Sequence, residues 1–580
     1  MGESPRTLSD LSGGYLSGPT GDIYDRYRLL SSGNLNHFYI DIGKNGGDSK
    51  KLCDVMNKLQ LQAFQINSDW LKYLLDNEMS FVESVCKDIQ CSRYEDFIIK
   101  LALAYDGYHF DLPAFLDFRG RIYRSGVLHF HERDLARSLI LFAGTKPMES
   151  ISNDMKNPFF EAAAFHFKNF PTAEKAHEWL YKNVDQINKN PSHFALEAKR
   201  PFQFFANMIG LTAYKMDVLR NTPITQDASA SAYQIMSYFL LDETMAKRTN
   251  LIPSSDGEIQ DVYAFFLEEL KEFMKVELPN NLSTIVCKYL TRKHVKGIFM
   301  PKIYGKTLMS TANDLKEHLS HYITHKECFV VASACFKFWK ERYPGMECLI
   351  RLIRHIGWIA SAGDRPVFYK VPYFTTVQDY MIMEPTNIWV YDRLHKKRRK
   401  VTLRVSSSKR DRRKTDISTF VNFIHQKDAN IAMNVVEEML SFNEPIYTVH
   451  ENFLSTATNS NLIPMIYSNV IRNMGPPLSI INEFIYMNVM KHIIKRDSIK
   501  TSNCESALDQ EHEQLNSLEA RFSKIEEERE QLAVEIRYLQ AKDAEFLKQQ
   551  DSLVAEFKKA NEGISRKLAE LEERSPETRL

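Results

Sequence analysis

The segment "EPIYTVHENFLST", from Glu444 to Thr456, contains two short β-prone runs separated by three polar residues. Pro445 to Val449 and Phe453 to Thr456 form the runs, and the residues between them are His450, Glu451 and Asn452. Branched and aromatic residues around a short polar stretch predict a tight β-hairpin, here with an imidazole and a carboxylate at its tip. Most charged hairpin tips are simply solvated. The meaning of this pair therefore depends on whether the chain supplies a partner for the carboxylate.

Length and composition indicate a folded protein of ordinary character. The chain has 580 residues and a mass of 67.4 kDa, enough to bury large cores and to form more than one lobe. Its 44% hydrophobic and 26% charged residues are typical of globular proteins. No run is long and apolar enough to span a bilayer, so no membrane partner is expected. The start, "MGESPRTLSDLSGGYLSGPTG", resembles neither a secretory signal nor a convincing transit peptide.

The C-terminal part differs from the rest in charge and in periodicity. From Glu505 onward there are 12 basic and 19 acidic residues, whereas the preceding part has 63 basic and 55 acidic residues. A mildly basic body is typical of proteins that bind polyanions. In the tail, apolar residues recur every seven positions, namely Leu518, Ile525, Leu532, Leu539, Phe546 and Leu553. This heptad predicts a coiled coil over 505–575 that pairs with a second copy or a partner helix; a single solvated helix is the alternative.

Upstream of the tail, helical and strand-like regions follow one another. Residues 1–50 are rich in Gly, Ser and Asp and are predicted to be a flexible segment. Residues 51–110 show apolar residues at helical spacing, with a helix start at Asn67 to Asp69. Mixed helix and strand follow, and then a helix-rich block runs to about Ala360. In 365–405, "NIWVYDRLHKKRRKVTLRV" predicts two strands joined by a basic turn, which contains Lys396, Lys397, Arg398, Arg399 and Lys400.

Three further stretches hold the charged residues that are candidates for a site. In "PITQDASASAYQ", Asp227 follows a strand-like run and precedes a helix. In "TRKHVKGIFMPKIYGKTL", Arg292 and Lys296 share one helical face and Tyr304 follows, an arrangement that can bind a triphosphate and stack a base. In "DFRGRIYRSG", three arginines flank a glycine: Arg119, Arg121 and Arg124. Taken singly, the aspartate has an ordinary explanation as a helix cap and the basic residues as a solvated face.

Taken together, these stretches resemble the single-subunit RNA polymerases of bacteriophages and mitochondria. Asp227 in "DASASAYQ", the basic pair with Tyr304, and the hairpin pair His450-Glu451 stand in the order and spacing of that family's three polymerase motifs. "LDFRGRIY" is similar to the family's template-contacting motif, and "NFIHQKD" is similar to the stretch before its last motif. The similarity extends over roughly 57–495. It is closest to the enzymes encoded on linear mitochondrial plasmids of plants and fungi.

The resemblance implies a right-hand polymerase of the α+β class, mostly helical, with an appended C-terminal coiled-coil helix. It places a reduced, helical thumb at 51–110 and the first part of the palm at 111–245. The fingers, with the basic β-hairpin, would be 246–414, and the second part of the palm would be 415–500. By the same resemblance, a mitochondrial location is expected.

The resemblance also implies a chemistry, DNA-directed RNA synthesis from nucleoside triphosphates on a DNA template. Two Mg²⁺ ions would be held by the carboxylates of Asp227 and Glu451 and the carbonyl of Ala228. Arg292 and Lys296 would bind the β- and γ-phosphates, and Lys296 would protonate the leaving pyrophosphate. Tyr304 and His425 would sense the ribose 2′-hydroxyl. The expected nucleic-acid contacts are Arg119, Arg121, Arg124, Lys396, Lys397, Arg398, Arg399 and Lys400.

The chain departs from the family pattern in ways that leave a second hypothesis open. Where the family has Asp, this chain has Glu451, and a carboxylate misplaced by about 1 Å can cost about a hundredfold in rate. Little of the chain is left for a promoter-handling N-terminal domain, and the heptad tail is not a family feature. The alternative is therefore a catalytically impaired, truncated and fused remnant that binds nucleic acid and oligomerises. A related DNA polymerase is disfavoured by Tyr304 and His425.

Overall fold

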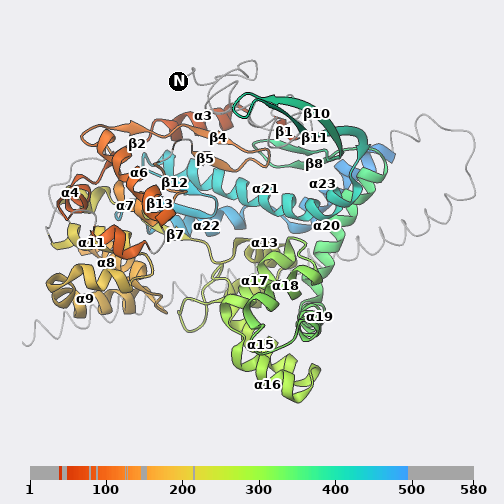
Figure 1. Ribbon diagram of the computed structural model, residues 1–580, viewed down its shortest axis with the longest axis horizontal. Helices are drawn as coiled ribbons and strands as arrows, with labels where there is room; N and C mark the ends of the chain where they lie inside the picture. Colours follow the sequence, from red (N-terminus) through yellow and green to blue (C-terminus); the bar gives the residue numbers. More distant parts are fainter. Residues whose placement is uncertain are drawn as a thin grey trace, which may run out of the picture. The chain divides into compact units, whose positions relative to one another are not determined.

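The computed structural model describes residues 38–41, 49–77, 80–86, 89–124, 126, 128–144, 153–212 and 216–493. Within these ranges the chain is mostly helical with several small antiparallel sheets, which confirms the predicted α+β class (Figure 1). The predictions of a flexible segment over 1–50 and of a coiled coil over 505–575 lie outside the described residues, apart from 38–41 and the start of the first described helix.

The helices precede and follow short strands throughout. In chain order the helices are α3 (Ser49–Gln60), α4 (Ser68–Asp76), α5 (Ser80–Val85), α6 (Ile89–Tyr105), α7 (Asp134–Leu139), α8 (Asn153–Phe167), α9 (Ala173–Lys189), α10 (Pro191–Glu197), α11 (Pro201–Thr212), α12 (Met216–Asn221), α13 (Ser231–Leu240), α14 (Glu243–Arg248), α15 (Val262–Glu277), α16 (Asn280–Tyr289), α17 (Arg292–Ile303), α18 (Leu308–Leu319), α19 (His325–Arg342), α20 (Pro344–Ala362), α21 (Arg412–Ser441), α22 (Leu462–Arg472), α23 (Pro477–Ile485) and the π-helix η2 (Tyr486–Met490). Of the helices described, none has the length and apolar character needed to cross a bilayer.

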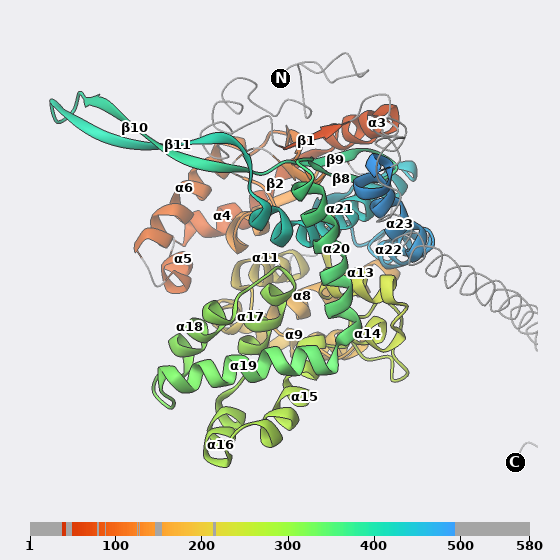
Figure 2. The same ribbon diagram turned by 90° about the vertical axis from the view of Figure 1, so that its right-hand side faces the viewer.

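The strands are short, with one long exception. They are β1 (Phe38–Asp41), β2 (Ala63–Ile66), β3 (Phe110–Asp111), β4 (Ala114–Leu116), β5 (Ile122–Arg124), β6 (Ile140–Phe142), β7 (Ile224–Asp227), β8 (Val367–Lys370), β9 (Thr375–Gln378), β10 (Met381–Asp392), β11 (Lys397–Arg410), β12 (Tyr447–Val449) and β13 (Asn452–Ser455). The hairpin of β10 and β11 is the longest pair, and it extends away from the helices around it (Figure 2).

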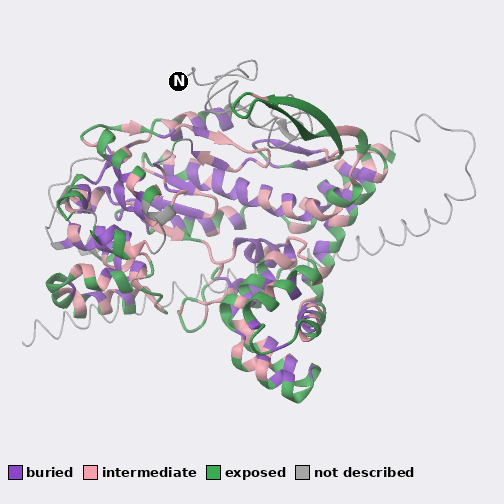
Figure 3. Cartoon of the chain, viewed as in Figure 1, coloured by how far each residue is buried: buried purple, intermediate pink, exposed green. Residues whose placement is uncertain are grey.

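The sheet that matters for function contains β12, β13 and β7, with β13 in the centre. Both pairings are antiparallel, and Asn452 at the start of β13 lies opposite Asp227 at the end of β7. The two faces of this sheet are buried in different hydrophobic clusters. Tyr447 and Leu454 belong to one cluster, with β2 and α4 to α11, whereas Phe453 belongs to the other, with α13 and α15 to α23. Burial on both faces holds the register of the sheet (Figure 3).

Helix α21 is a long central helix that contacts β12 of this sheet, and it packs against α20, α22, α13 and α3 (Figure 1). Asp411 caps its start by accepting a hydrogen bond from the Lys414 amide. Along α20, Gly357 permits the close approach of the two helices, because a Cβ there would collide with the side chain of Thr419. The cap at Asp411 and the close contact with α20 fix the position of helix α21. Buried side chains project from more than one face of this helix.

The structure corrects two details of the sequence interpretation. Residues 51–110 are not wholly helical, because β2 lies between α3 and α4 and pairs with β3 and β6. Phe64 and Ile66 are buried there and alternate with less buried neighbours, a strand period too short to stand out against the helical pattern around it. The predicted helix start at Asn67 is confirmed, since its side chain accepts from the Trp70 amide.

The second detail concerns the basic hairpin. Lys397, Arg398, Arg399 and Lys400 belong to strand β11, not to the turn. Only Lys396 of the five predicted basic residues lies in the turn, with a φ of 49°. Because side chains alternate along a strand, the four strand residues are divided between the two faces of the ribbon.

Candidate active site

Asp227 is placed by a strand that ends and a helix that begins within a few residues. Strand β7 runs from buried Ile224 to Asp227, whose side chain is accessible to solvent, and α13 starts at Ser231. Ala230, the residue before the helix, has a φ of 59°, a left-handed conformation that turns the chain sharply. The carboxylate of Asp227 therefore projects at the end of the sheet, as the sequence predicted.

Glu451 lies in the turn of the β12–β13 hairpin, which confirms the hairpin predicted from Glu444 to Thr456. The turn consists of two residues, His450 and Glu451, and Asn452 belongs to β13 instead of the tip. His450 has a φ of 59°, and positive φ at the first central residue is what two-residue hairpin turns require. The Thr448 hydroxyl donates to the carbonyl of His450 at 2.6 Å and steadies the turn.

The sheet brings Asp227 and Glu451 together although 223 positions separate them in the chain. Beyond the last ladder pair, the Ala228 amide donates to the carbonyl of Glu451 at 3.3 Å. Partial burial removes water from around the Asp227 carboxylate and raises its pKa, and the negative charge of Glu451 raises this pKa further. The positive charges of Arg200, Lys296 and Arg137 act in the opposite direction. Two adjacent carboxylates that repel each other form a site that a cation would stabilise.

The donor set fits magnesium. Asp227, Glu451 and the carbonyl of Ala228 offer hard oxygen atoms, and Mg²⁺ is usually bound by one or two carboxylates with water and substrate phosphates completing the octahedron. Among the described residues, no three or more His, Cys, Asp or Glu side chains are grouped to hold a metal on their own. The arrangement thus suits an ion that is shared with a phosphate-bearing substrate.

Helix α17 carries the predicted basic pair, Arg292 and Lys296, in its first two turns. Arg292 opens the helix and Lys296 lies one turn later, and each cation lies 5.7 Å from the ring centroid of Tyr263. Arg292 is also paired with Asp261 through two hydrogen bonds. Lys296 is exposed, and in the described part of the chain its ammonium has neither an ion-pair nor a hydrogen-bond partner. Its positive charge is nevertheless close enough to Asp227 to lower the pKa of that carboxyl.

Tyr304 and His425 meet beside this pair. Tyr304 directly follows α17 as its C-cap, and its ring centroid lies 5.3 Å from that of His425 on α21. Burial lowers the pKa of His425 to about 2, and the charges of Arg121 and Arg119 contribute, so the imidazole is neutral. Its Nδ1 lies 2.7 Å from Nη1 of Arg119. Because a guanidinium can only donate, Nδ1 is the acceptor and the ring proton is on Nε2, which has no hydrogen-bond partner among the residues that the structure describes.

The turn from Asp117 to Arg121 positions the arginine that fixes this tautomer. The Asp117 carboxylate accepts from the amides of Arg119 and Arg121 at 2.8 and 3.0 Å, and from the Arg119 side chain at 2.6 Å. Gly120 has a φ of 84°, and a Cβ there would collide with the ring of Phe374. Only glycine satisfies both conditions. Arg119 is therefore directed by Asp117 toward His425.

An ion pair lies behind the site. Arg121 donates to the carboxylate of Asp428 at 2.6 Å, and both side chains are largely buried. Burial raises the pKa of Asp428, and the charge of Arg121 opposes this effect. Asp117, Asp261, Tyr263 and Asp428 were all missed as site residues by the sequence interpretation. Asp117 and Asp428 do stand inside the stretches "LDFRGRIY" and "NFIHQKD", so their place in those motifs was the available signal.

Comparison with known proteins agrees with this geometry. The sequence profile for the DNA-dependent RNA polymerase family matches residues 165–546, well over half of the chain. The matched range includes Asp227, Lys296 and Glu451. The chain belongs to this polymerase family. The resemblance inferred from the motifs is thereby confirmed.

Individual relatives in the polymerase family match only part of their own length. The chain is 32% identical to a probable DNA-directed RNA polymerase from Zea mays, over 84% of this chain and 52% of the relative. It is 26% identical to a probable DNA-directed RNA polymerase from Agaricus bitorquis, over 73% of this chain and 44% of that protein. T7 RNA polymerase from Escherichia phage T7 is 25% identical over 29% of this chain and 20% of the phage protein. The chain thus spans about half the length of the plant and fungal relatives.

One predicted nucleic-acid contact of this polymerase family member is wrong. Arg124 is only 4% exposed, and its guanidinium donates to the carbonyls of Leu112 and Leu59 at 2.7 and 3.1 Å. It lies on β5, where alternation turns Ile122 and Arg124 into the core and Tyr123 toward His450. Burial lowers the pKa of Arg124 to about 10. Arg124 is a structural residue, whereas Arg119 and Arg121 precede the strand, where Arg119 contacts His425 and Arg121 pairs with Asp428.

Proposed function

We propose that the chain is a DNA-directed RNA polymerase that transfers ribonucleoside monophosphates from nucleoside triphosphates to an RNA 3′ end on a DNA template. The observation that carries the proposal is that strand β7 and the turn of the β12–β13 hairpin bring Asp227 and Glu451 together, with the positive charge of Lys296 close enough to act on Asp227. Extension of an RNA primer on an RNA–DNA scaffold tests it, because a preformed scaffold needs no promoter recognition. Extension that requires Mg²⁺ and follows the template sequence is expected.

Each proposed residue has a distinct part in the reaction. Asp227, Glu451 and the Ala228 carbonyl would hold two Mg²⁺ ions, which when bound activate the 3′-hydroxyl and stabilise the charge that develops on the pyrophosphate. Lys296 binds the β- and γ-phosphates and donates a proton to the leaving pyrophosphate. Arg292 binds the same phosphates, and its ion pair with Asp261 fixes the position of its side chain. Since Lys296 has no competing anionic partner among the described residues, it is the first cation available to an incoming triphosphate.

Ribose selection is proposed to depend on Tyr304 and His425. The Nε2–H of His425 can donate to the oxygen of a 2′-hydroxyl, and the Tyr304 hydroxyl can donate or accept. A deoxyribose would leave these polar groups unpaired, at a cost of about 1–3 kcal/mol. This polar pair favours RNA as the product.

Tyr304→Phe is expected to reduce discrimination against deoxynucleotides by roughly 5- to 150-fold, the equivalent of about 1–3 kcal/mol. Ribonucleotide incorporation should stay nearly unchanged, because the ring against His425 is kept. The measurement is competitive incorporation of ATP and dATP on the scaffold. Tyr181→Phe, at an exposed tyrosine on α9, is the matched control. Unchanged discrimination in Tyr304→Phe would show that Tyr304 is not the ribose sensor.

The β10–β11 hairpin is proposed to contact DNA or the nascent hybrid, and its two faces differ. Cross-strand pairing places Trp389 opposite Lys400 and Tyr391 opposite Arg398, so one face combines aromatic rings with positive charges. Trp389 and Tyr391 are 69% and 57% exposed. Exposed aromatic rings beside basic residues suit stacking on bases and contact with phosphates.

The opposite face is less suited to nucleic acid. It carries Lys397 and Arg399 together with Ile388, Val390 and Val401, and Arg399 is paired with Asp392 at 2.9 Å. A merely solvated ribbon is the alternative for the whole hairpin. A double substitution on either face therefore removes two positive charges, so the two faces can be compared at equal loss of charge.

Replacement of Lys396, Lys397, Arg398, Arg399 and Lys400 by Ala is expected to lower the salt slope of DNA binding by up to about 0.9 per lost phosphate contact. Most of the change should come from Arg398→Ala with Lys400→Ala, on the aromatic face. The matched control is Lys397→Ala with Arg399→Ala. Fluorescence anisotropy of labelled duplex at several salt concentrations measures the slopes. An unchanged slope in the five-residue variant would exclude the hairpin, and equal slopes in the two pairs would exclude the aromatic face.

The domain names of the family are also proposed for this chain. The palm is assigned to 111–245 and 415–500, the fingers to 246–414, and a reduced thumb to 51–110. The assignment is supported by the position of β7, β12 and β13 within the two palm segments and of α17 within the fingers. A mitochondrial location and a coiled-coil partner for 505–575 are proposed on the resemblance and the heptad pattern, respectively.

A second candidate function is favoured by Glu451, where the family has Asp. In that case the chain binds nucleic acid without appreciable turnover. The scaffold experiment separates the two functions: binding of the scaffold with no extension by any variant indicates the non-catalytic function.

A further inference from the structure

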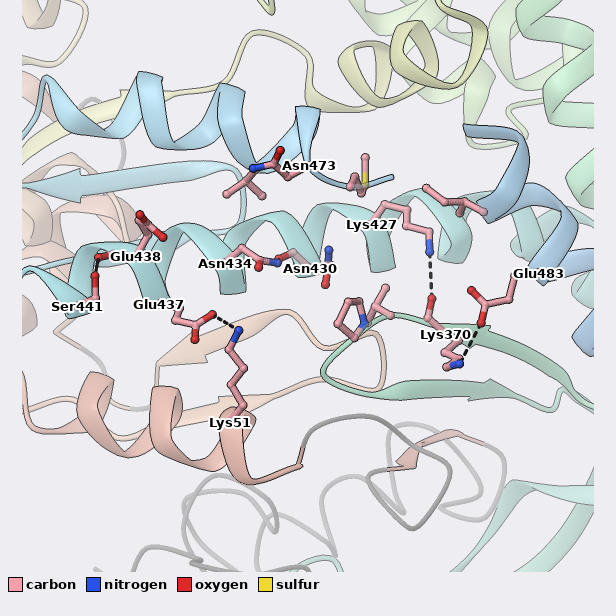
Figure 4. A pocket seen from close by; sticks show the side chains of 15 residues that line it. Lys51, Lys370, Lys427, Asn430, Asn434, Glu437, Glu438, Ser441, Asn473 and Glu483 are labelled. Carbon is pink, nitrogen blue, oxygen red and sulfur yellow. Dashed lines mark hydrogen bonds and ion pairs between the residues drawn. The ribbon is translucent and has the colours of Figure 1, made fainter. Parts of the chain in front are cut away.

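A polar cavity lies on the side of α21 away from the Arg121–Asp428 ion pair. Its volume is about 610 Å³, within the range of small-molecule sites. Helix α21, the start of α3, the turn between β8 and β9, and the segment from α22 to α23 form its walls (Figure 4). None of the residues proposed above for the metal, the nucleotide or nucleic acid lines it. The cavity is thus a separate feature of the chain.

One stripe of α21 supplies most of the polar lining. Lys427, Asn430, Asn434 and Glu437 follow at three- and four-residue spacing, so they share one helix face. In Figure 4 their side chains project from the helix toward the β8–β9 turn and Lys51. At one end, Lys427 is 5% exposed and its ammonium donates to the backbone carbonyl of Lys370 at 3.1 Å. That carbonyl is the ammonium's one described hydrogen-bond acceptor.

Asn430 lies one turn along α21 from Lys427, and its buried side chain has an oxygen atom without a hydrogen-bond partner among the described residues. This atom is Oδ1, and Asn430 is also 5% exposed. A buried polar group without a partner costs on the order of 1–3 kcal/mol. The lining of this cavity therefore contains unused donors on Lys427 and an unsatisfied acceptor on Asn430.

The other charges of the cavity are mostly paired across it. Lys51 binds Glu437 at 2.9 Å, and Lys370 binds Glu483 at 3.0 Å. Glu438 lies at the far end of the stripe, beyond Glu437. The carboxylates of these three glutamates disfavour a polyanion such as a triphosphate. The unpaired positive charge at Lys427 favours a ligand with a single anionic group.

We propose that this cavity binds a small molecule bearing one anionic group, a carboxylate or a phosphate monoester, with Lys427 and Asn430 as the recognising pair. The ammonium neutralises the anion, and the carboxamide completes its hydrogen bonds or binds an adjacent hydroxyl or amine. Apolar contacts from Val371, Pro372 and Ile480 would cover the rest of the molecule. The site is independent of the proposed polymerase activity.

Protection of Lys427 from acetylation tests the proposal on the full chain. Burial lowers the pKa of Lys427 to about 8, and the charge of Glu483 opposes this effect. At pH 7.5 a larger fraction of its amine is therefore unprotonated than in an ordinary lysine. A brief pulse of acetic anhydride acetylates the free amine and releases acetate and a proton. A bound anion would block access and raise the pKa of Lys427 toward its ordinary value, so it should slow the reaction.

The probes are 20 mM inorganic phosphate and 20 mM acetate, compared with chloride at equal ionic strength, and peptide mass spectrometry measures the rates. At least one probe should slow acetylation of Lys427 fivefold or more, while exposed Lys182 changes by less than 1.5-fold. Protection by phosphate alone indicates a phosphate monoester, and protection by acetate alone indicates a carboxylate. In Asn430→Ala the protection should fall below twofold, whereas Asn183→Ala, on α9, should retain it.

Two results would overturn the proposal. If Lys427 is acetylated at equal rates in chloride, phosphate and acetate, no anion binds beside it. If Lys427 is not acetylated in any buffer while Lys182 is, the cavity does not admit a small molecule. Neither result bears on polymerase activity, which the scaffold measures separately.

Discussion

Asp227→Asn is expected to reduce scaffold extension at least about a thousandfold, the equivalent of about 4 kcal/mol in transition-state stabilisation. Asn has the same shape but lacks the charge that an Mg²⁺ ligand requires. The fold should be kept, because Asp227 ends its strand with an accessible side chain, and loss of its charge removes the repulsion from Glu451. Thermal unfolding of the variant should therefore be unchanged or slightly raised in temperature.

The control for this variant is Asp185→Asn, an exposed aspartate on α9. If Asp227→Asn keeps more than a tenth of the extension rate, the carboxylate pair is not the metal site and the proposed mechanism is wrong. If the unaltered chain extends too slowly to measure, Mn²⁺ binding followed by electron paramagnetic resonance replaces turnover as the readout. Binding by the unaltered chain and its loss in Asp227→Asn are then expected.

Glu451→Asp is expected to increase scaffold extension, by up to about a hundredfold. The hairpin turn holds the backbone of Glu451 beside β7, since the Ala228 amide donates to its carbonyl. The side chain must therefore fold back to bring its longer arm to the position of a shorter ligand. Asp restores that length without a change in charge, whereas Glu451→Gln keeps the length and removes the charge. Extension should rank Asp above Glu and Glu above Gln.

The ranking of these three forms decides between the competing interpretations of the hairpin. Turnover by the unaltered chain at or above that of Glu451→Asp would show that the longer side chain reaches the metal without loss of rate and that Glu is no impairment. No turnover in either form, with the scaffold still bound, would support the non-catalytic function. Glu is itself a competent Mg²⁺ ligand, so slow extension by the unaltered chain is the expected result.

Local sequence patterns predicted the elements that carry the site. Alternating residues around a polar tip predicted the hairpin at Glu451, and a strand-like run before small residues predicted the strand end at Asp227. Helical spacing predicted that Arg292 and Lys296 share a face, and both lie over the ring of Tyr263. These features depend on residues a few positions apart, whose backbone preferences are expressed locally.

Where the local pattern was ambiguous, prediction failed. Strand β2 has only four residues between two helices, so its period could not be separated from theirs. Arg124 follows Arg119 and Arg121 in one motif, but whether it points inward depends on the pairing of β5 with β4 and on the core behind them. Basic side chains look alike in sequence, and only burial distinguishes a structural arginine from one that lines a site.

By itself, the sequence determined which segments become helix or hairpin and which chemical groups the site can contain. Tertiary structure alone decided how those groups are paired. Arg119 reaches His425 and Arg121 reaches Asp428 across more than three hundred positions, and no local pattern encodes contacts of that separation. They form because the sheet of β7, β12 and β13 is buried on both faces and α21 contacts it, so that packing of distant segments brings these side chains together. The tautomer of His425 and the repulsion between Asp227 and Glu451 are consequences of that packing.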